Sequence, residues 1–424
     1  MTPPDEKRRP FPAGRPAFAA GAFFFAAAMC FFLLRGFSRL TPGLLQNSND
    51  LRIYWQTGEA VLSGRLPYRD FFIEYPPGAV PAFLLPAFFT DNRLAYIDAF
   101  ALQMGLFLVA SLVMVGVSSR RMFGTASWPL PTATFAVCAS LLYPVALTRY
   151  DATVTLALAV AVFGAALGGR WVYLAYVSLG FGAAAKLVPV LAAPALAATR
   201  GRFVGGFLVA GAVGLLFVVP AAFLGETRFL ESLLYHSERG VQIESVPASL
   251  LLASGSVEAV IFDFGAFEVT GPGTGFAAAT SLPVTLGLLT VTGFFAYRDY
   301  RAGRLGAAAF PRYAAAFILA FMVGSKVLSP QYFLWLLPLV PLAGSGSVRA
   351  VVSFLFVATC YLTTEVFPKS YTALVGLQSP GPELLLARNV GLVLLWLAVV
   401  FLPLLARDDR KDDRKLRIPS GASA

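Results

Sequence analysis

The chain has few charged residues and few residues of the kinds that bind metals or form disulfides. Asp, Glu, Lys and Arg make up 13% of its 424 residues, and His236 is the single histidine. A soluble domain of this length needs a charged surface, and a mean hydropathy of +0.71 excludes one. Cys30, Cys138 and Cys360 each lie in an apolar run, without the spacing of a zinc site or a disulfide framework, so we expect them to pack as apolar side chains.

Motifs for nucleotide binding are absent as well. No glycine-rich loop follows a candidate strand, there is no P-loop, and residues 39–78 contain no Asp-x-Asp pair. These absences argue against nucleotide-sugar substrates and against a two-carboxylate metal clamp. With one histidine and no cysteine cluster, the sequence predicts no metal and no cofactor. Isolated acids in several segments leave open a metal site that forms only in the folded chain.

The chain does have a series of long apolar runs separated by short basic loops. Spans need about 17–25 apolar residues, and basic residues in short loops mark the cytoplasmic side. Threading on this basis predicts an all-α, polytopic membrane protein with about twelve transmembrane crossings and both termini in the cytoplasm. Its parts are a basic tail over 1–16, one transmembrane domain over 17–406 and a charged tail over 407–424. The net charge of +10 fits such loops, so no nucleic-acid partner is expected.

Two segments are predicted to lie on the external side of the membrane, and the first of them is too polar to span. They are a first external loop over 39–78 and a longer one over 225–281. The arginines in the first loop count against this placement, but the loop is long and also carries acids.

The first external loop has the pattern of an interfacial helix. Apolar residues recur at roughly helical spacing from Leu51 to Leu62, which suits a helix lying on the membrane surface. Gly64 is expected to end this helix, and Pro67 to begin an extended stretch. The pattern fits two interpretations equally well: a helix that only anchors the chain at the membrane surface, with its charges in solvent, and a functional segment.

One apolar run, over 171–198, contains Gly180, Gly182, Lys186 and Pro189 in its middle. Basic residues flank both of its ends, which places both ends in the cytoplasm. That is possible only if the run turns near Lys186. We therefore predict two helices, with Lys186 near the external side.

This threading places a group of ionisable residues at one face of the membrane. Ionisable side chains at membrane depth are costly, so they indicate a functional site. Their gathering at one face indicates chemistry on a charged substrate there. The residues are Asp50, Glu74, Arg149, Asp151, Lys186, His236, Arg239 and Lys326.

Several stretches of charged, aromatic and proline residues follow one another between Asp50 and Pro338. They are Asp50…Tyr54…Gly64…Pro67-Tyr68…Glu74-Tyr75-Pro76-Pro77, then Arg149-Tyr150-Asp151, then Gly180-Phe181-Gly182…Lys186-Leu187-Val188-Pro189, then the loop from His236 through Arg239 to Ser245, then Lys326-Val327-Leu328-Ser329-Pro330-Gln331-Tyr332-Phe333-Leu334-Trp335. Their order and spacing resemble glycosyltransferase family 87, which comprises bacterial membrane mannosyltransferases of the GT-C class that use polyprenyl-phosphate-mannose. The chain after Pro338 adds little to the resemblance.

The resemblance implies an inverting glycosyltransferase at the outer face of the cytoplasmic membrane. Its donor is then a polyprenyl-phosphate-linked mannose or similar sugar, and its acceptor a glycolipid, lipoglycan or glycan. Asp50 is then the general base that deprotonates the acceptor hydroxyl in a single displacement. Beside Ser48 and Asn49, Asp50 also suits the capping of the helix that follows, and the two roles are compatible.

A lipid-phosphate donor also needs cations to hold its leaving phosphate. Lys186, Arg239 and Lys326 are the first candidates, and Arg149 is the next. His236 is a candidate catalytic residue at the donor phosphate or leaving group, although a lone histidine in a loop is often incidental.

The remaining candidates are polar residues suited to contact the substrate. Asp151 is expected to pair with Arg149 or to orient a neighbouring base, and a purely structural ion pair explains it as well. The candidates for contact with sugar or phosphate are Glu74, Tyr75, Glu244, Gln331 and Tyr332.

Other functions remain as alternatives. A transporter or lipid flippase predicts ionisable residues distributed along a pathway near the midplane, whereas here they gather at one face. A GT-C enzyme that uses another lipid-linked sugar, such as arabinofuranose or glucose, fits the same residues.

Overall fold

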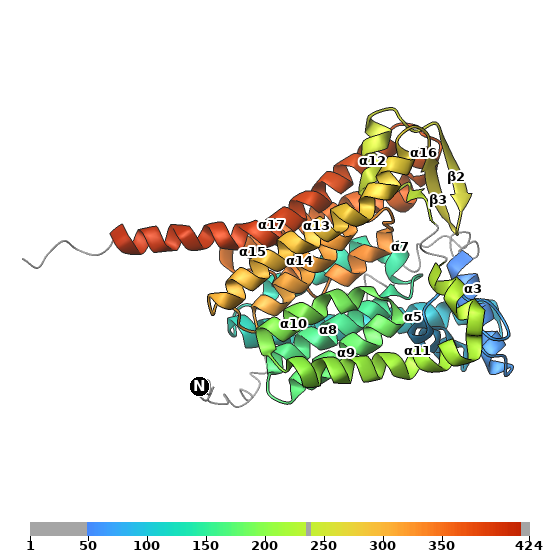
Figure 1. Ribbon diagram of the computed structural model, residues 1–424, viewed down its shortest axis with the longest axis horizontal. Coiled ribbons are helices and arrows are strands. Elements are labelled where there is room, and N and C mark those ends of the chain that lie inside the picture. The colour runs from blue at the N-terminus through green and yellow to red at the C-terminus, as the bar shows by residue number, and fades with distance from the viewer. Residues whose placement is uncertain (1–48, 235–238, 417–424) are drawn as a thin grey trace, which may run out of the picture.

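The computed structural model describes residues 49–234 and 239–416, and most of this chain is helical (Figure 1). The predicted tail over 1–16 and first span over 17–37 lie outside the described residues. Five described helices are long and apolar enough to cross a membrane. They are α5 (Arg93–Phe123), α11 (Phe203–Leu234), α13 (Thr274–Arg301), α15 (Gly346–Thr364) and α17 (Gly381–Leu416).

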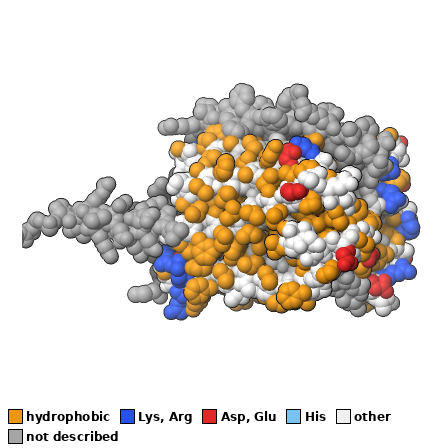
Figure 2. Space-filling model, turned by 90° about the horizontal axis from the view of Figure 1, so that it is seen from above, with side chains coloured by type: hydrophobic (Ala, Val, Ile, Leu, Met, Phe, Trp, Pro, Cys, Tyr) orange, Lys and Arg blue, Asp and Glu red, His pale blue; other side chains and the backbone are white. Residues whose placement is uncertain are grey.

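The outer surface of these helices is apolar. Figure 2 shows hydrophobic side chains across the middle of the molecule, with most of the visible Lys and Arg towards its two ends. Leu216 and Phe223 on α11, and Leu282 and Phe294 on α13, are among the large exposed apolar side chains. Such a belt on helices of membrane length is typical of a protein embedded in lipid. The predicted all-α, polytopic membrane class is confirmed, while the number of crossings stays a prediction.

Shorter apolar helices pack among the long ones. They are α4 (Val80–Ala87), α6 (Pro129–Leu141), α8 (Asp151–Leu167), α9 (Trp171–Ala185), α10 (Ala193–Arg200) and α14 (Ala309–Gly324). Small residues allow close contact between them, as expected for helices packed in a membrane. Gly180 of α9 lies so close to α11 that a Cβ there would stand 2.2 Å from the carbonyl oxygen of Ala210. Gly180 is therefore a packing residue.

The predicted break near Lys186 is confirmed. Helix α9 ends at Ala185, and Lys186 has an extended backbone with φ −162° and ψ 125°. A 3-10 helix, η2 (Val188–Ala192), then leads into α10. Pro189 lacks an amide hydrogen and cannot continue α9, which gives the break its local cause.

The helix predicted in the first external loop is also confirmed. It is α3 (Asn49–Leu62), which lies at one end of the helix bundle (Figure 1). It stops before Gly64, whose φ of +85° suits glycine best. A short 3-10 helix, η1 (Pro77–Ala79), then leads into α4.

The segment between the helices is shorter than the predicted loop over 225–281, and its described part contains regular structure. Helix α11 continues to Leu234, and α13 begins at Thr274. Between them lie α12 (Val246–Ala253) and a small antiparallel sheet of β1 (Val241–Gln242), β2 (Ala259–Asp263) and β3 (Ala266–Thr270), in the order β1-β3-β2. This sheet lies at the same end of the bundle as α3 (Figure 1).

The threading counts the apolar runs over 130–147 and 332–342 as one crossing each, but prolines break both of them. The run over 130–147 divides into α6 and α7 (Tyr143–Ala146), with Pro144 in the second helix. The run over 332–342 forms two 3-10 helices, η3 (Pro330–Leu336) and η4 (Val340–Leu342). Pro338 and Pro341 remove backbone donors there, so one continuous α-helix cannot form. Near the end of the chain, η5 (Glu365–Lys369) and α16 (Tyr371–Val375) connect α15 to α17.

Candidate active site

Asp50 lies in the first turn of α3, where both of its carboxylate oxygens have side-chain partners. The Tyr75 hydroxyl donates to Oδ1 at 2.7 Å, and the Arg149 guanidinium forms an ion pair with Oδ2. These partners come from different parts of the chain, which is more than a helix cap requires. The Asp50 side chain remains 28% exposed, so a substrate hydroxyl can approach it.

Asp151, the first residue of α8, is buried and pairs with Lys186. Lys186 Nζ and Trp335 Nε1 each donate to Asp151 Oδ1 at 2.7 Å. The expected pair of Asp151 with Arg149 is not formed, because Arg149 pairs with Asp50 instead. Arg149 and Asp151 are two residues apart at the start of α8, so their side chains point in different directions. Asp151 therefore pairs with Lys186 and not with Arg149.

Aromatic rings surround the Lys186 ammonium. Nζ lies 5.1 Å from the ring centre of Tyr150, 5.2 Å from that of Tyr332 and 5.0 Å from that of Trp335. The rings of Tyr332 and Trp335 stack with centroids 4.1 Å apart. Cation–π contacts and the Asp151 carboxylate together hold the ammonium in place. The lysine side chain is 19% exposed, so part of it remains accessible.

A second group of rings supports Asp50. Tyr54 stacks on Phe83 with centroids 4.3 Å apart, and the edges of Tyr75 and Tyr150 pack against this pair. Tyr54 is one turn after Asp50 on α3, and Phe83 lies on α4. This packing fixes the position of the Tyr75 hydroxyl and thereby of the Asp50 carboxylate.

Arg239 and Lys326 meet near the same end of the bundle. The Lys326 ammonium donates to the backbone carbonyl of Arg239, and Arg239 donates to the carbonyl of Phe264 at 2.8 Å. Arg239 also lies within electrostatic range of Lys186 and Tyr332. The structure therefore brings Arg239 towards the Lys186 site, and Lys326 adjoins it through the backbone.

Three further candidates have less direct support. Gln331 is half-buried in η3 beside Tyr332, and Glu74 precedes Tyr75 and lines a pocket beside α3. His236 lies outside the described residues. The roles assigned to these three side chains stay predictions.

Glu244 belongs to a buried cluster that includes a residue the sequence analysis missed. Its carboxylate hydrogen-bonds with Tyr371 and lies 3.7 Å from Arg388, whose guanidinium also donates to the Glu244 carbonyl at 2.7 Å. Burial raises the pKa of the Glu244 carboxyl to about 7. Arg149 lies within electrostatic range of Glu244, which connects this cluster to Asp50. Arg388 could have been found in the sequence, because it is an isolated arginine in the apolar run after 384.

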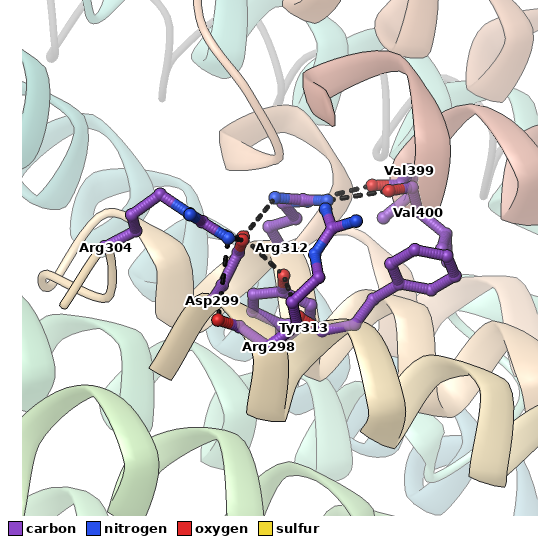
Figure 3. Close-up of polar contacts among 8 residues, drawn as sticks. Arg298, Asp299, Arg304, Arg312, Tyr313, Val399 and Val400 are labelled. Atoms are coloured by element: carbon purple, nitrogen blue, oxygen red, sulfur yellow. Dashed lines mark hydrogen bonds and ion pairs between the residues drawn. The ribbon is translucent and has the colours of Figure 1, made fainter. Parts of the chain in front are cut away.

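A second ionic cluster lies around Asp299, near the C-terminal end of α13 (Figure 3). Asp299 is fully buried and accepts from Arg304 at 2.7 and 2.9 Å and from the Tyr313 hydroxyl at 2.7 Å. Arg312 lies 3.5 Å from the same carboxylate and donates to the carbonyls of Val399 and Val400 on α17. This cluster ties α13, α14 and α17 together.

Within residues 49–234 and 239–416, no group of three or more His, Cys, Asp or Glu side chains is arranged to hold a metal ion. The charged groups around Asp50 and Lys186 are instead mixed in sign and interleaved with tyrosines and a tryptophan. Such a set suits an anionic substrate that carries a hydroxyl-rich group, because the cations can bind the anion and the acids and phenols can bind hydroxyls.

Comparison with known proteins gives a family match. Residues 72–330, more than half of the chain, match the model of glycosyltransferase family 87. Arg149, Asp151, Lys186 and Lys326 lie inside this match, whereas Asp50 precedes it. No curated protein matches the chain.

Two solved structures are similar in overall shape. Both are crystal structures of ArnT from Cupriavidus metallidurans, one bound to undecaprenyl phosphate and one in the apo state. The first has 14% sequence identity and a TM-score of 0.49, over 91% of this chain and 77% of that one. The second has 13% identity and a TM-score of 0.47, over 91% and 78% of the two chains.

Proposed function

Because this chain belongs to glycosyltransferase family 87, we propose that it transfers a mannosyl residue from polyprenyl-phosphate-mannose to a glycolipid, lipoglycan or glycan acceptor. It is a membrane glycosyltransferase with a helical, GT-C-like fold. The proposed reaction takes place at the outer face of the cytoplasmic membrane, where the first external loop and the small sheet then lie.

The observation that carries this proposal is the position of Asp50. Its partly exposed carboxylate is held between the Tyr75 hydroxyl and the Arg149 guanidinium, at the same end of the bundle as Lys186. A fixed carboxylate beside cations is what a glycosyl transfer with a phosphate leaving group needs.

The proposed chemistry is a single inverting displacement. The acceptor oxygen attacks the anomeric carbon of the donor sugar while Asp50 removes the hydroxyl proton. The bond from that carbon to the phosphate oxygen breaks, and the electron pair leaves with the polyprenyl phosphate. Lys186 and Arg149 stabilise the charge that develops on this phosphate, with Arg239 as a further cation.

Arg149 gives the site an order of events. In the structure it occupies Asp50 Oδ2, so that oxygen is not open to an acceptor hydroxyl. A donor phosphate offers the guanidinium a bidentate partner, and Arg149 then moves from Asp50 to the phosphate. The base therefore becomes free when the donor is bound, which limits deprotonation to the complex that can react.

The test uses purified protein in liposomes with radiolabelled polyprenyl-phosphate-mannose and a lipid acceptor extract from the source membrane. Asp50→Asn should lower transfer by about 10²–10⁴-fold while donor binding is retained. Asp70→Asn is the matched control, because Asp70 lies in the same external loop, is 29% exposed and pairs with an arginine, Arg69. That variant should transfer at the wild-type rate.

The outcomes separate the parts of the proposal. Transfer that survives in a folded Asp50→Asn protein leaves the enzyme but removes Asp50 as the base. If the protein transfers arabinofuranose or glucose from its lipid carrier but does not transfer mannose, the proposed sugar is wrong and the proposed enzyme class stands. Failure of wild type with every lipid-linked donor overturns the enzyme and favours a transporter or flippase.

A further inference from the structure

A pocket beside α3 is lined by Glu74, the residue before the Asp50 partner Tyr75, and has no role in the chemistry described above. Its volume of about 580 Å³ is within the usual range for small-molecule sites. One wall is a side of α3, and the other is the segment from Arg65 to Glu74. The pocket is therefore built entirely from the first external loop.

Each wall of the pocket includes residues close in the sequence to Asp50 or to its partner Tyr75. On α3, Ile53, Thr57 and Ala60 line it, and they follow Asp50 at spacings of three, seven and ten residues. Such spacings place side chains along one side of a helix, with Asp50 at the end of the row. On the opposite wall, Glu74 lines the pocket and the next residue, Tyr75, donates to Asp50.

The lining has the chemistry of a carbohydrate site rather than of a phosphate site. Trp55 and Phe71 offer aromatic surface, and Gln56, Glu59 and Glu74 offer hydrogen-bonding groups. Arg65 is the one cation among the lining residues described, and its guanidinium lies over the Phe71 ring at 5.7 Å. The two acids and one cation of this lining disfavour an anion, whereas the cations Arg149 and Lys186, which do not line the pocket, favour one.

We propose that this pocket binds the sugar of the acceptor that carries the attacking hydroxyl, with Trp55 as its main specificity residue. The inference rests on the proposed function, since it assigns the second substrate of the same reaction. An acceptor held here approaches Asp50 from the side opposite the donor phosphate. That arrangement is the one a single displacement requires.

Two measurements on the full chain in nanodiscs test this. The first is tryptophan fluorescence during titration with methyl α-mannoside, methyl α-glucoside and the corresponding disaccharides. At least one probe should give a saturable change that is lost in Trp55→Phe. The second is transfer kinetics, in which Trp55→Ala should raise the acceptor KM by about tenfold without changing the donor KM. Trp55→Phe keeps an aromatic face and should raise it less.

Trp171→Ala is the matched control, because Trp171 is a half-exposed tryptophan at the start of α9, at the other end of that helix from Lys186. It should leave both the titration and the acceptor KM unchanged. Absence of a saturable change with every probe overturns the sugar site, and so does an unchanged acceptor KM in an active Trp55→Ala enzyme. A Trp55-dependent change in a protein that transfers nothing keeps the pocket and removes the proposed function.

Discussion

Two ionic clusters, one at Asp299 near the C-terminal end of α13 and one at Asp50 in the first turn of α3, differ in how completely protein groups surround their carboxylates. Around Asp299, two arginines and a tyrosine hydroxyl meet one fully buried carboxylate, and the second arginine also binds two backbone carbonyls (Figure 3). Around Asp50, the carboxylate is 28% exposed and its partner Arg149 is 19% exposed. The Asp299 carboxylate is closed to further ligands, although Arg304 is 39% exposed, whereas the Asp50 carboxylate is open.

The difference separates a structural ion pair from a candidate catalytic one. A buried charge without full compensation is costly, so a cluster that serves only the fold should be sealed by its own partners. A cluster that binds a charged substrate must leave an approach to its charges. The Asp299 cluster meets the first condition, and the Asp50 and Lys186 groups meet the second.

Removal of the Asp299 carboxylate should have the largest effect on stability. Asp299→Ala leaves Arg312 buried without its anion, which typically costs about 3–5 kcal/mol. Thermal unfolding in detergent measures this as a large fall in Tm, while transfer activity per folded molecule is retained. Asp98→Ala, at an exposed acid on α5, should change stability by less than about 0.5 kcal/mol. An unchanged Tm in Asp299→Ala would contradict the structural role of the closed cluster.

The opposite pattern is expected at the open cluster. Arg149→Gln should lower the transfer rate by about 10²–10³-fold, because it removes a cation from the leaving phosphate. Stability should change little, since Asp50 stays partly solvated and keeps the Tyr75 hydroxyl. Arg69→Gln is the control, because Arg69 pairs with Asp70 in the same loop. A large fall in Tm with normal turnover would make Arg149 a structural residue.

Glu244 is buried beside Arg388, and its titration should be visible in the pH dependence of stability. Burial raises its pKa from 4.5 to about 7 in the folded protein. The folded state therefore binds the proton more tightly than the unfolded chain. This contribution, about 3 kcal/mol, is fully present below pH 4.5 and is lost as pH rises through about 7.

Glu244→Gln should remove that slope. The measurement is Tm at several pH values between about 4.5 and 8, for wild type and variant. Glu383→Gln, at an exposed acid near the start of α17, should keep the wild-type slope. A variant whose Tm falls with pH as steeply as the wild type would show that Glu244 is not the group responsible.

The sequence was sufficient for the features that depend on local chemistry. Apolar periodicity predicted α3, and Pro189 with the flanking basic residues predicted the break at Lys186. Membrane threading also placed Asp50, Arg149, Asp151 and Lys186 at one end of the molecule, because each adjoins the end of an apolar run. Because the ends of these helices are neighbours in the fold, the residues at them come into contact.

The features that the sequence did not predict depend on distant pairings. Trp335 bonds Asp151 across 184 residues, and nothing near either residue indicates the other. The strands β2 and β3 are five residues each, too short for a strong alternating pattern. Arg388 sits in a stretch with little family resemblance, so its contact with Glu244 became visible only in the fold.

A third kind of ion pair, at the surface, should contribute least to stability. Lys369 Nζ lies 2.5 Å from Glu365 Oε1, closer than Lys186 to Asp151, but its side chain is 57% exposed. Water screens such a pair, so Lys369→Ala should change stability by no more than about 0.5 kcal/mol and leave transfer unchanged. Thermal unfolding and the liposome assay measure both. If this variant lost as much stability as Asp299→Ala, distance rather than enclosure would determine what an ion pair contributes here, and the contrast between the closed and open clusters would lose its physical basis.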